Sequence, residues 1–223
     1  MKAKERVKES KKILHNVYLI EKGEKRILAT KSKYGSHYGE KRFGEFREWI
    51  PTRSKLAAML LKGYRVDIKP NWKVLYLGAA SGTTVSHLAD IVEKGIIYAV
   101  EYSAKPFTKL IELAEERRNI IPLLEDASKP ERYSGIVEKV DFIYQDIAQR
   151  NQVEIFLDNI RMFLKEGGEG LIMVKARSID STAEPSEVFE AVLRRLSKQV
   201  KVVAHDSLEP YHRDHIFVHV RLE

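Results

Sequence analysis

The segment formed by residues 73–92 constrains the fold of this chain most strongly. Residues 74–77 are an apolar run typical of a buried strand, the loop that follows contains Gly78 and Gly82, and apolar residues then recur at helical spacing as far as Val92. A strand, a glycine-rich loop and a helix in this order favour an α/β fold that binds a ligand at the start of the helix. Glycine adopts backbone conformations that a Cβ forbids, so we expect both glycines to let the main chain come close to that ligand.

A carboxylate, Glu101, follows the second apolar run at residues 96–100. In open α/β nucleotide folds a carboxylate at this place commonly binds ribose hydroxyls. The dinucleotide pattern G-x-G-x-x-G is not met, because Ala80 stands where the second glycine belongs, and this argues against a nicotinamide enzyme.

The same loop carries three hydroxyl side chains, Ser81, Thr83 and Thr84. Such a loop suits an uncharged part of a ligand better than a pyrophosphate. S-adenosyl-L-methionine has a ribose, an adenine and an amino acid but no phosphate, and it is therefore the cofactor we expect. The alternative is an ordinary strand-to-helix turn without a ligand.

The composition of the chain excludes several kinds of chemistry. Its 223 residues include no cysteine, so disulfides, a thiolate nucleophile and a cysteine-based zinc site are impossible. The formal charge of +7 favours a polyanionic partner such as RNA, although the lysine and glutamate enrichment typical of thermophiles would also raise both charge counts. No apolar run reaches membrane-spanning length, and the Lys/Glu-rich residues 1–12 lack the apolar centre of a signal peptide. We therefore expect a cytoplasmic protein with no membrane partner, in which residues 1–12 form a solvated tail or the first turn of a helix.

Residues 1–50 have a different pattern from the rest of the chain. Short β-prone runs at 17–20 and 26–29 flank a Lys-Gly-Glu turn, and glycines separate further short runs within 34–46. We predict a small antiparallel β unit with a basic tail over residues 1–50, followed by a second domain over residues 51–223. The unit interleaves aromatic with basic residues, namely Tyr34, Tyr38, Phe43, Phe46 and Trp49 with Lys31, Lys33, Lys41, Arg42 and Arg47. This mixture could stack on RNA, and the alternative is that the rings form the unit's own core or dock a protein partner.

The remaining chain alternates between helices and strands in the manner of a doubly wound sheet. Thr52 or Ser54 can cap a helix that places Lys55 in its first turn, where a cation opposes the helix dipole and so hints at a function. Further helices are predicted at 105–117, from 153 to a stop at Gly167 and Gly168, and at 185–197. Further strands are predicted at 120–124, 140–144, 171–174, 200–204 and 216–222, the last two antiparallel. The expected sheet therefore has about seven strands.

Polar residues end four of the predicted strands: Glu101, Asp126, Asp146 and Lys175. Ligands of open parallel sheets bind beyond the carboxyl ends of the strands. A capping or solvent-facing role is the default for each residue alone, but the four together favour a shared site. Asp126 and Ala127 are candidates to receive the adenine, with the carboxylate accepting from the exocyclic amine and a main-chain N–H donating to a ring nitrogen.

Five motifs, taken together, resemble the fibrillarin family in its short archaeal form. They are LYLGAASGTTVSH at 75–87, ERRNI at 116–120, QDIAQ at 145–149, VKARSID at 174–180 and LEPY at 208–211. The resemblance implies a Rossmann-like class I methyltransferase that uses S-adenosyl-L-methionine to methylate ribose 2′-hydroxyls of rRNA or tRNA. It also implies a box C/D particle that contains a guide RNA paired to its target RNA, a Nop-family scaffold protein and a kink-turn-binding ribosomal-protein homologue.

The resemblance and the strand ends together predict the residues that bind the cofactor. These are Gly78, Ala80, Ser81, Gly82, Thr83, Thr84, Glu101, Tyr102, Asp126, Ala127, Asp146, Ile147, Ala148 and Gln149. No residue is expected to bind a metal.

The resemblance to 2′-O-methyltransferases also implies a catalytic tetrad at Lys55, Asp146, Lys175 and His215. A ribose hydroxyl is a poor nucleophile at neutral pH, so the enzyme must align it with the methyl group and help its proton leave. Lys175 is the candidate for the group that faces the hydroxyl. The charge of Lys55 would favour the uncharged form of Lys175, and Asp146 would orient both lysines.

The fourth tetrad position is open between two histidines. The family pattern corresponds here to Arg213-Asp214-His215, but His212 lies close by in the sequence. A metal site formed by His212, His215 and His219 is the rival interpretation, and the lack of an accompanying carboxylate cluster with ligand spacing argues against it.

Three functions remain open at this stage. The first is the guide-directed RNA methyltransferase, and the second is a methyltransferase of the same fold that acts on a protein side chain. The third is a scaffold that binds S-adenosyl-L-methionine without turnover. The two lysines and Asp146 argue against the second function because a more acidic acceptor would need less help, and the intact tetrad argues against the third.

Overall fold

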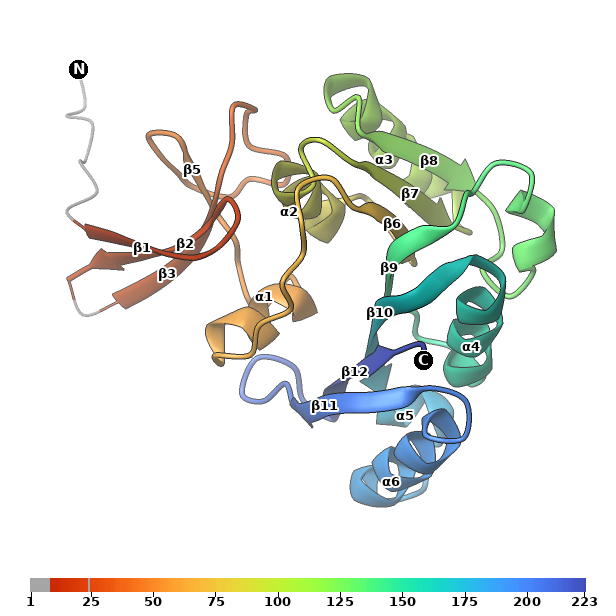
Figure 1. The fold of residues 1–223 in the computed structure, drawn as a ribbon. Helices are drawn as coiled ribbons and strands as arrows, with labels where there is room; N and C mark the ends of the chain where they lie inside the picture. The colour runs from red at the N-terminus through yellow and green to blue at the C-terminus, as the bar shows by residue number, and fades with distance from the viewer. Residues whose placement is uncertain (1–8, 24) are drawn as a thin grey trace.

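The computed structural model of the protein describes residues 9–23 and 25–223, which form two β-sheets with helices between and around them (Figure 1). The N-terminal sheet is antiparallel, with the strand order β1-β2-β3-β5-β4. Its strands are β1 (Glu9–Leu14), β2 (Val17–Lys22), β3 (Lys25–Lys31), β4 (Arg42–Phe43) and β5 (Phe46–Glu48). The predicted antiparallel β unit is therefore present.

The first strand contradicts the prediction of a solvated tail or helix turn at residues 1–12. Residues 9–12 belong to β1 and pair with β2, while residues 1–8 lie outside the described part of the chain. Asn16 closes the turn between the strands with a positive φ of 55°, a conformation that asparagine tolerates well. The sequence of this edge strand does not alternate between polar and apolar residues, so it did not predict a strand. The strand forms through its pairing with β2.

Most of the aromatic residues of this region form a core. Phe43 and Phe46 pack with Ile20 and Ala29, and the fully buried Trp49 stacks on His87 at a ring-centroid distance of 4.8 Å. The interpretation as the unit's own core is thus confirmed for Phe43 and Phe46, whereas Trp49 belongs to a larger core that the unit shares with residues beyond position 50. Stacking on RNA is wrong for all three rings. Arg47 is also fully buried, so it does not belong to a basic RNA-binding surface.

The second sheet has seven strands in the order β11-β12-β10-β9-β6-β7-β8. They are β6 (Lys73–Leu77), β7 (Ile96–Glu101), β8 (Ile120–Leu124), β9 (Val140–Gln145), β10 (Leu164–Lys175), β11 (Lys201–Ser207) and β12 (His215–Arg221). Strands β6 to β10 are parallel to one another, whereas β12 runs antiparallel to both β10 and β11. The predicted α/β sheet with an antiparallel last pair is confirmed.

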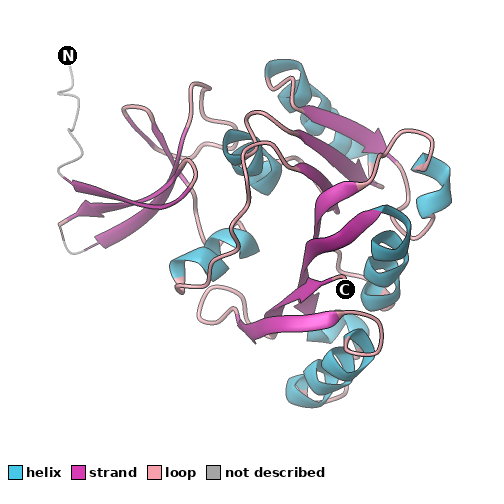
Figure 2. Ribbon diagram, viewed as in Figure 1, coloured by secondary structure: helices cyan, strands magenta, loops and turns pink. Residues whose placement is uncertain are grey.

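Helices cover both faces of the seven-stranded sheet (Figure 2). One face packs against α1 (Lys55–Leu61), α2 (Thr83–Ile91) and α3 (Ala104–Glu116). The other face packs against α4 (Gln152–Phe163), the short α5 (Ala176–Ile179), α6 (Pro185–Leu196) and a 3₁₀ turn at Pro130–Tyr133. The N-terminal sheet lies against the α1 and α2 side, where Val17, Leu28 and Trp49 join the same apolar core. No helix of the described residues is both long and apolar enough to cross a membrane.

The predicted helix stop at Gly167 and Gly168 is wrong. Helix α4 ends at Phe163, and Leu164 already has an extended backbone and pairs with Val140 of β9. The two glycines lie within β10 and bond to the C-terminal end of the chain, with Gly167 N–H donating to Leu222 O and Leu222 N–H donating to Gly168 O. The two glycines form a local irregularity in a strand. The helical spacing of the apolar residues before them could not predict this.

The chain changes direction across the sheet between β6 and β9. After β6 it adds β7 and β8 on one side, and it then returns to add β9 and β10 on the other. The two central strands pair at Leu77 and Gln145, so their carboxyl ends lie side by side. Ligands of open α/β folds bind in the crevice at such a switch point.

Candidate active site

The cofactor loop, residues 78–84, begins at the end of β6 and is packed tightly against the rest of the chain. Gly78 and Gly82 have φ values of +83° and +88°. A Cβ at Gly78 would lie 2.5 Å from the carbonyl oxygen of Asp146, and one at Gly82 would lie 2.5 Å from Cδ2 of Leu113. Protein atoms thus fill the space of a Cβ at both positions, and the approach of a ligand to the main chain here stays a prediction.

The side chain of Glu101, at the end of β7, binds main-chain N–H groups, one of them in the cofactor loop. Its Oε2 accepts a hydrogen bond from Ala80 N–H at 2.8 Å, and its Oε1 accepts one from Ser103 N–H at 2.7 Å. A carboxylate has about four acceptor sites, so two bonds leave capacity for ribose hydroxyls. Ala80 itself has a φ of 48°, an uncommon conformation for a residue with a Cβ.

The other predicted cofactor residues lie along the same edge of the sheet. Asp126 follows β8, and its Oδ1 accepts hydrogen bonds from the hydroxyl and the N–H of Ser128, which lower the pKa of the carboxyl. Ala127 is buried, whereas Tyr102 after β7 is 72% exposed. Residues 146–149 follow β9, with Ile147 half-buried and both Ala148 and Gln149 exposed. The edge therefore offers carboxylates and an exposed ring near the switch point.

Lys55 and Asp146 form an ion pair beside the cofactor loop. The distance from Lys55 Nζ to Asp146 Oδ1 is 2.7 Å, and the two side chains are 19% and 24% exposed. Lys55 is the first residue of α1, whose cap Ser54 accepts a hydrogen bond from Ala57 N–H and bonds Thr84 Oγ1 at 2.9 Å. The predicted cap and the predicted first-turn lysine are confirmed, and the cap ties α1 to the cofactor loop.

Lys175 and His215 lie opposite each other in the antiparallel pair of β10 and β12. Side chains alternate between the faces of a strand. Leu171 and Met173 of β10 and Phe217 of β12 face the core that contains α1, so Lys175 and His215 share this face. Asp146 continues the same alternation from Tyr144 of β9. All four predicted tetrad residues therefore lie on the α1 side of the sheet at one edge. Within the described residues, the ammonium of Lys175 has no hydrogen-bond or ion-pair partner.

Both candidate histidines lie near this group. His212 Nε2 is 2.8 Å from Pro51 O, His215 Nδ1 is 2.6 Å from Arg213 O, and the rings are 5.9 Å apart. Burial lowers the pKa of both imidazoles, and the charge of Lys55 lowers each further. An uncharged His215 that donates from Nδ1 keeps an acceptor lone pair on Nε2, whereas Nε2 of His212 is bound to the main chain.

His219 does not join the other two histidines. It bonds the hydroxyl of Tyr64 at 2.8 Å and the carboxylate of Glu169 at 3.1 Å, near the opposite end of β12. In the part of the chain that the structure describes, no three His, Asp or Glu side chains are grouped as metal ligands. The rival interpretation, a metal site formed by His212, His215 and His219, is therefore wrong.

Two residues near the site were not predicted from the sequence. Gln152 is buried and holds the backbone of Lys175 from both sides, with Oε1 accepting from Lys175 N–H at 3.2 Å and Nε2 donating to Lys175 O at 3.5 Å. Its Nε2 also donates to Gln149 O at 2.8 Å. His37 of the N-terminal region bonds the main chain of Ser81. No local pattern marks either residue, because each acts through a contact far away in sequence.

The site suits a ligand with hydroxyls and a positive charge better than a phosphate. The cofactor loop carries hydroxyls but no lysine or arginine, and the carboxylates of Glu101, Asp126 and Asp146 end or follow strands at the same edge of the sheet. S-adenosyl-L-methionine presents ribose hydroxyls, an adenine amine and a cationic sulfonium, all of which carboxylates favour. Fold and site together define a Rossmann-like methyltransferase that uses S-adenosyl-L-methionine.

The comparison with known proteins gives the family. The fibrillarin family model matches residues 7–223, and the chain belongs to the fibrillarin family. A fibrillarin-like rRNA/tRNA 2′-O-methyltransferase of Archaeoglobus fulgidus is 68% identical over 94% of this chain and 98% of that protein.

Two solved structures are similar over nearly the whole chain. The fibrillarin of a fibrillarin/Nop5p complex has a TM-score of 0.92 at 67% identity, covering 96% of this chain and all of that one. An Aeropyrum pernix fibrillarin with natively bound S-adenosyl-L-methionine has a TM-score of 0.83 at 39% identity, covering 95% of this chain and 99% of that one.

Proposed function

We propose that this chain transfers the methyl group of S-adenosyl-L-methionine to the 2′-hydroxyl of a ribose in rRNA or tRNA. The observation that carries the proposal is the gathering of Lys55, Asp146, Lys175 and His215 at one edge of the sheet, beside the cofactor loop of a fibrillarin-family chain. The Archaeoglobus fulgidus relative is named for this activity, which supports the assignment.

Four side chains have distinct tasks in this reaction. Bound S-adenosyl-L-methionine supplies a methyl group that its sulfonium already makes electrophilic. Lys175, in its uncharged form, accepts the proton of the 2′-hydroxyl at Nζ while the oxygen–methyl bond forms and the sulfur–methyl bond breaks. Asp146 holds Lys55 in place, with 2.7 Å between its Oδ1 and Lys55 Nζ. His215, opposite Lys175, orients that amine through the lone pair on Nε2.

The cofactor residues follow from the same edge. Glu101 would bind the ribose hydroxyls of S-adenosyl-L-methionine, Asp126 and Ala127 would receive its adenine, and Asp146 would be a further contact. The remaining contacts come from the main chain and small side chains of the loop and of the segment after β9, namely Gly78, Ala80, Ser81, Gly82, Thr83, Thr84, Tyr102, Ile147, Ala148 and Gln149.

The partners of the reaction follow from the family and the charge. A scaffold of the Nop family is supported by the solved fibrillarin/Nop5p complex at 67% identity, and the net charge of +7 suits RNA. We further infer that a box C/D guide RNA selects the nucleotide by base pairing and that a kink-turn-binding ribosomal-protein homologue completes the particle. The 2′-hydroxyl of a paired nucleotide lies in the shallow minor groove of an RNA helix, so the enzyme reaches it without flipping a base.

The test is transfer of labelled methyl from S-adenosyl-L-methionine to a guide-paired RNA, with and without the scaffold and kink-turn proteins. A matched target carries a single 2′-deoxy sugar at the selected nucleotide. We expect label in the assembled particle and none on the deoxy target. Label on the deoxy target or on protein would show that the methyl acceptor is not the ribose 2′-hydroxyl. Cofactor binding without any transfer would show that the chain is a scaffold without turnover.

A further inference from the structure

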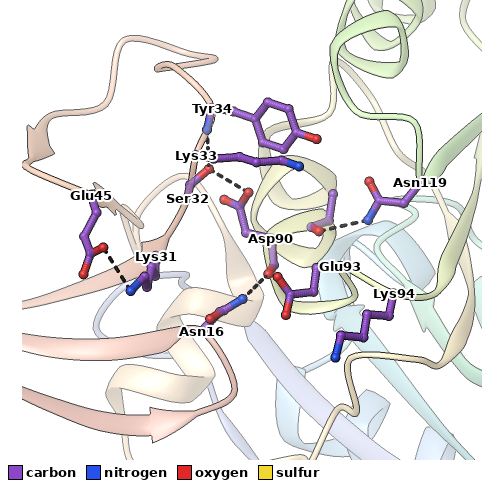
Figure 3. Close-up of a pocket in the computed structure, with 11 residues that line it drawn as sticks. Asn16, Lys31, Ser32, Lys33, Tyr34, Glu45, Asp90, Glu93, Lys94 and Asn119 are labelled. Atoms are coloured by element: carbon purple, nitrogen blue, oxygen red, sulfur yellow. Dashed lines mark hydrogen bonds and ion pairs between the residues drawn. The ribbon is translucent and has the colours of Figure 1, made fainter.

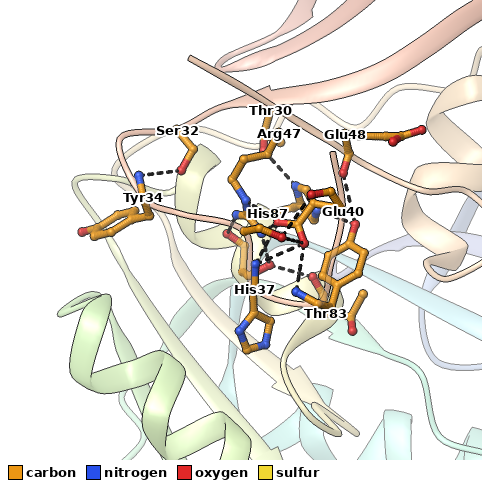
Figure 4. A network of polar contacts seen from close by, with 12 residues as sticks. Thr30, Ser32, Tyr34, His37, Glu40, Arg47, Glu48, Thr83 and His87 are labelled. Atoms are coloured by element: carbon orange, nitrogen blue, oxygen red, sulfur yellow. Dashed lines mark hydrogen bonds and ion pairs between the residues drawn. The ribbon is translucent and has the colours of Figure 1, made fainter. Parts of the chain in front are cut away.

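The segment between β3 and β4 joins the N-terminal sheet to the cofactor loop (Figure 4). Nε2 of His37 in this segment lies 2.7 Å from the carbonyl oxygen of Ser81. Burial lowers the pKa of His37, so the ring is uncharged at neutral pH and carries its proton on Nε2 to donate this bond. The same nitrogen would lie 3.4 Å from a Cβ at Gly82, so the ring also packs against the loop.

The carboxylate of Glu40 fixes the backbone that carries His37. It accepts hydrogen bonds from the N–H groups of His37 at 3.0 Å and Tyr38 at 2.9 Å, and from the hydroxyl of Ser36 at 2.9 Å. Burial would raise the pKa of Glu40, but these N–H donors and the charge of Arg47 lower it to about 2. The carboxylate therefore stays charged at neutral pH and holds the turn closed.

Arg47 links this turn to the helix that follows the cofactor loop. Its guanidinium is fully buried and pairs with Glu40 Oε1 at 2.6 Å. The same group pairs with Asp90 Oδ2 at 2.9 Å and donates to Ser86 Oγ at 3.0 Å, both on α2. The loop and the first turn of α2 are thus connected to the N-terminal sheet at two levels, by His37 at Ser81 and by Arg47 along the helix.

The cofactor loop is consequently held from two sides. On the side of the seven-stranded sheet, Glu101 accepts from Ala80 N–H, and on the side of the N-terminal sheet His37 donates to Ser81 O. Ala80 has a φ of 48°, so the peptide between these two bonds is in a conformation that an alanine rarely adopts unaided. A loop with this conformation needs contacts that favour it over its relaxed alternatives.

We propose that His37 is a positioning residue for cofactor binding, through its hydrogen bond to the carbonyl oxygen of Ser81. The N-terminal unit that we propose for residues 1–50 then completes the cofactor site of residues 51–223 without touching the cofactor. The inference rests on the proposed function only in requiring that the cofactor loop binds S-adenosyl-L-methionine.

The test measures S-adenosyl-L-methionine binding to the purified full chain by calorimetry, without RNA or partner proteins. His37→Phe keeps a ring but removes the donor, and we expect a Kd about 10-fold higher, the size of one lost hydrogen bond. His37→Gln places an amide Nε2 close to the position of the imidazole Nε2, and its Kd should stay within about 3-fold of the wild-type value. With methyl transfer as a second readout, His37→Phe should raise KM for the cofactor and leave kcat at saturation nearly unchanged.

A matched control is His15→Phe. His15 Nε2 bonds Glu93 Oε1 at 3.0 Å, another contact between the N-terminal sheet and the methyltransferase core. Glu93 lines a cavity of about 430 Å³ near the other end of α2, away from the cofactor loop (Figure 3). The control should therefore leave the cofactor Kd within about 2-fold of the wild-type value, because the His37 bond reaches the loop and the His15 bond does not.

Three results would overturn the inference: a His37→Phe chain that binds as tightly as wild type, a His37→Gln chain that binds as weakly as His37→Phe, or a His15→Phe control with an equal loss. If His37→Phe does not fold, His37→Asn replaces it, because its amide is one methylene too short and must bind weakly while His37→Gln binds well. A wild-type chain that fails to bind S-adenosyl-L-methionine would refute the proposed function as well, and this outcome differs from a failure of the variants alone.

Discussion

Lys175, the last residue of β10, is the cross-strand partner of His215, the first residue of β12. The pairing exists because β12 runs antiparallel to β10, so that its beginning lies at the carboxyl edge of the parallel strands. The histidine therefore reaches the same edge as Asp146, although its strand points the other way. Antiparallel addition at the end of the sheet is thus what completes the group of four side chains.

Lys175→Met should lower turnover while leaving cofactor binding intact. The thioether keeps the length of the stem but cannot accept a proton, and removal of a general base costs about 10²- to 10⁴-fold in kcat. The measurement is single-turnover methyl transfer in the assembled particle, with the cofactor Kd measured alongside. Lys165→Met at the opposite end of β10, where the lysine pairs with Asp141, is the control and should keep the wild-type rate. Near-normal turnover of Lys175→Met would remove Lys175 from its assigned role.

Gln152→Leu should weaken both the fold and the site. The leucine removes the side-chain partner of the half-buried main-chain groups of Lys175 and of the exposed carbonyl of Gln149, which costs about 0.5–1.5 kcal/mol of unfolding free energy. It also frees the backbone that carries Lys175, so we expect kcat to fall by about 10-fold even where the protein is fully folded. Urea unfolding and single-turnover transfer measure the two effects. Gln199→Leu on the surface serves as control, and a loss of stability with an unchanged kcat would show that Gln152 does not position Lys175.

Asp90→Asn should strongly destabilise the protein. Asp90 is buried and receives the guanidinium groups of both Arg47 and Arg117 and the hydroxyls of Thr30 and Ser32. The amide keeps the shape but removes the counter-charge of the buried Arg117 and leaves Arg47 paired with Glu40 alone. Breaking a buried ion pair in this way costs about 3–5 kcal/mol. The check is the urea midpoint at neutral pH. Asp67→Asn removes an exposed partner of Lys69 and should change stability by less than about 1 kcal/mol, so equal effects would contradict the prediction.

His87 should make the protein lose stability as the pH falls below neutrality. Burial, together with the charges of Arg47 and Arg117, lowers the pKa of His87 well below 6.5, so the folded ring stays uncharged where the unfolded ring takes up a proton. The unfolded state then binds more protons than the folded state, and stability is lost from about pH 6.5 downward at up to about 1.4 kcal/mol per pH unit. We expect a smaller drop in Tm between pH 7.5 and 5.5 in His87→Phe than in wild type.

The control for this titration is Thr30→Val, which removes the hydroxyl bonded to His87 Nδ1 at 2.8 Å but keeps the imidazole. It should be less stable than wild type at every pH while keeping the wild-type dependence on pH. A His87→Phe chain with the full wild-type drop would mean that another group carries the effect.

Local patterns in the sequence were sufficient for the elements that form the site. The apolar run before Gly78, the cap at Ser54 and the alternation of helices and strands predicted β6, α1 and the parallel sheet, because periodicity and capping depend on neighbours along the chain. The helix stop at Gly167 was wrong for a related reason. Glycine signals a break in any element, and only the pairing of Gly167 and Gly168 with Leu222 places that break inside a strand.

The sequence by itself determined the α/β class and the family, since periodicity and family motifs depend on residue types at fixed spacing, and the resemblance to that family gave the candidate tetrad. Only the tertiary structure decided that Arg47 is buried against Asp90, that Gly78 makes room for Asp146, and that His37 reaches Ser81. Each of these contacts joins segments that are far apart in the chain. Their partners are selected by packing and by the need to pair every buried charge, and one sequence records neither the distance nor the burial on which that selection depends.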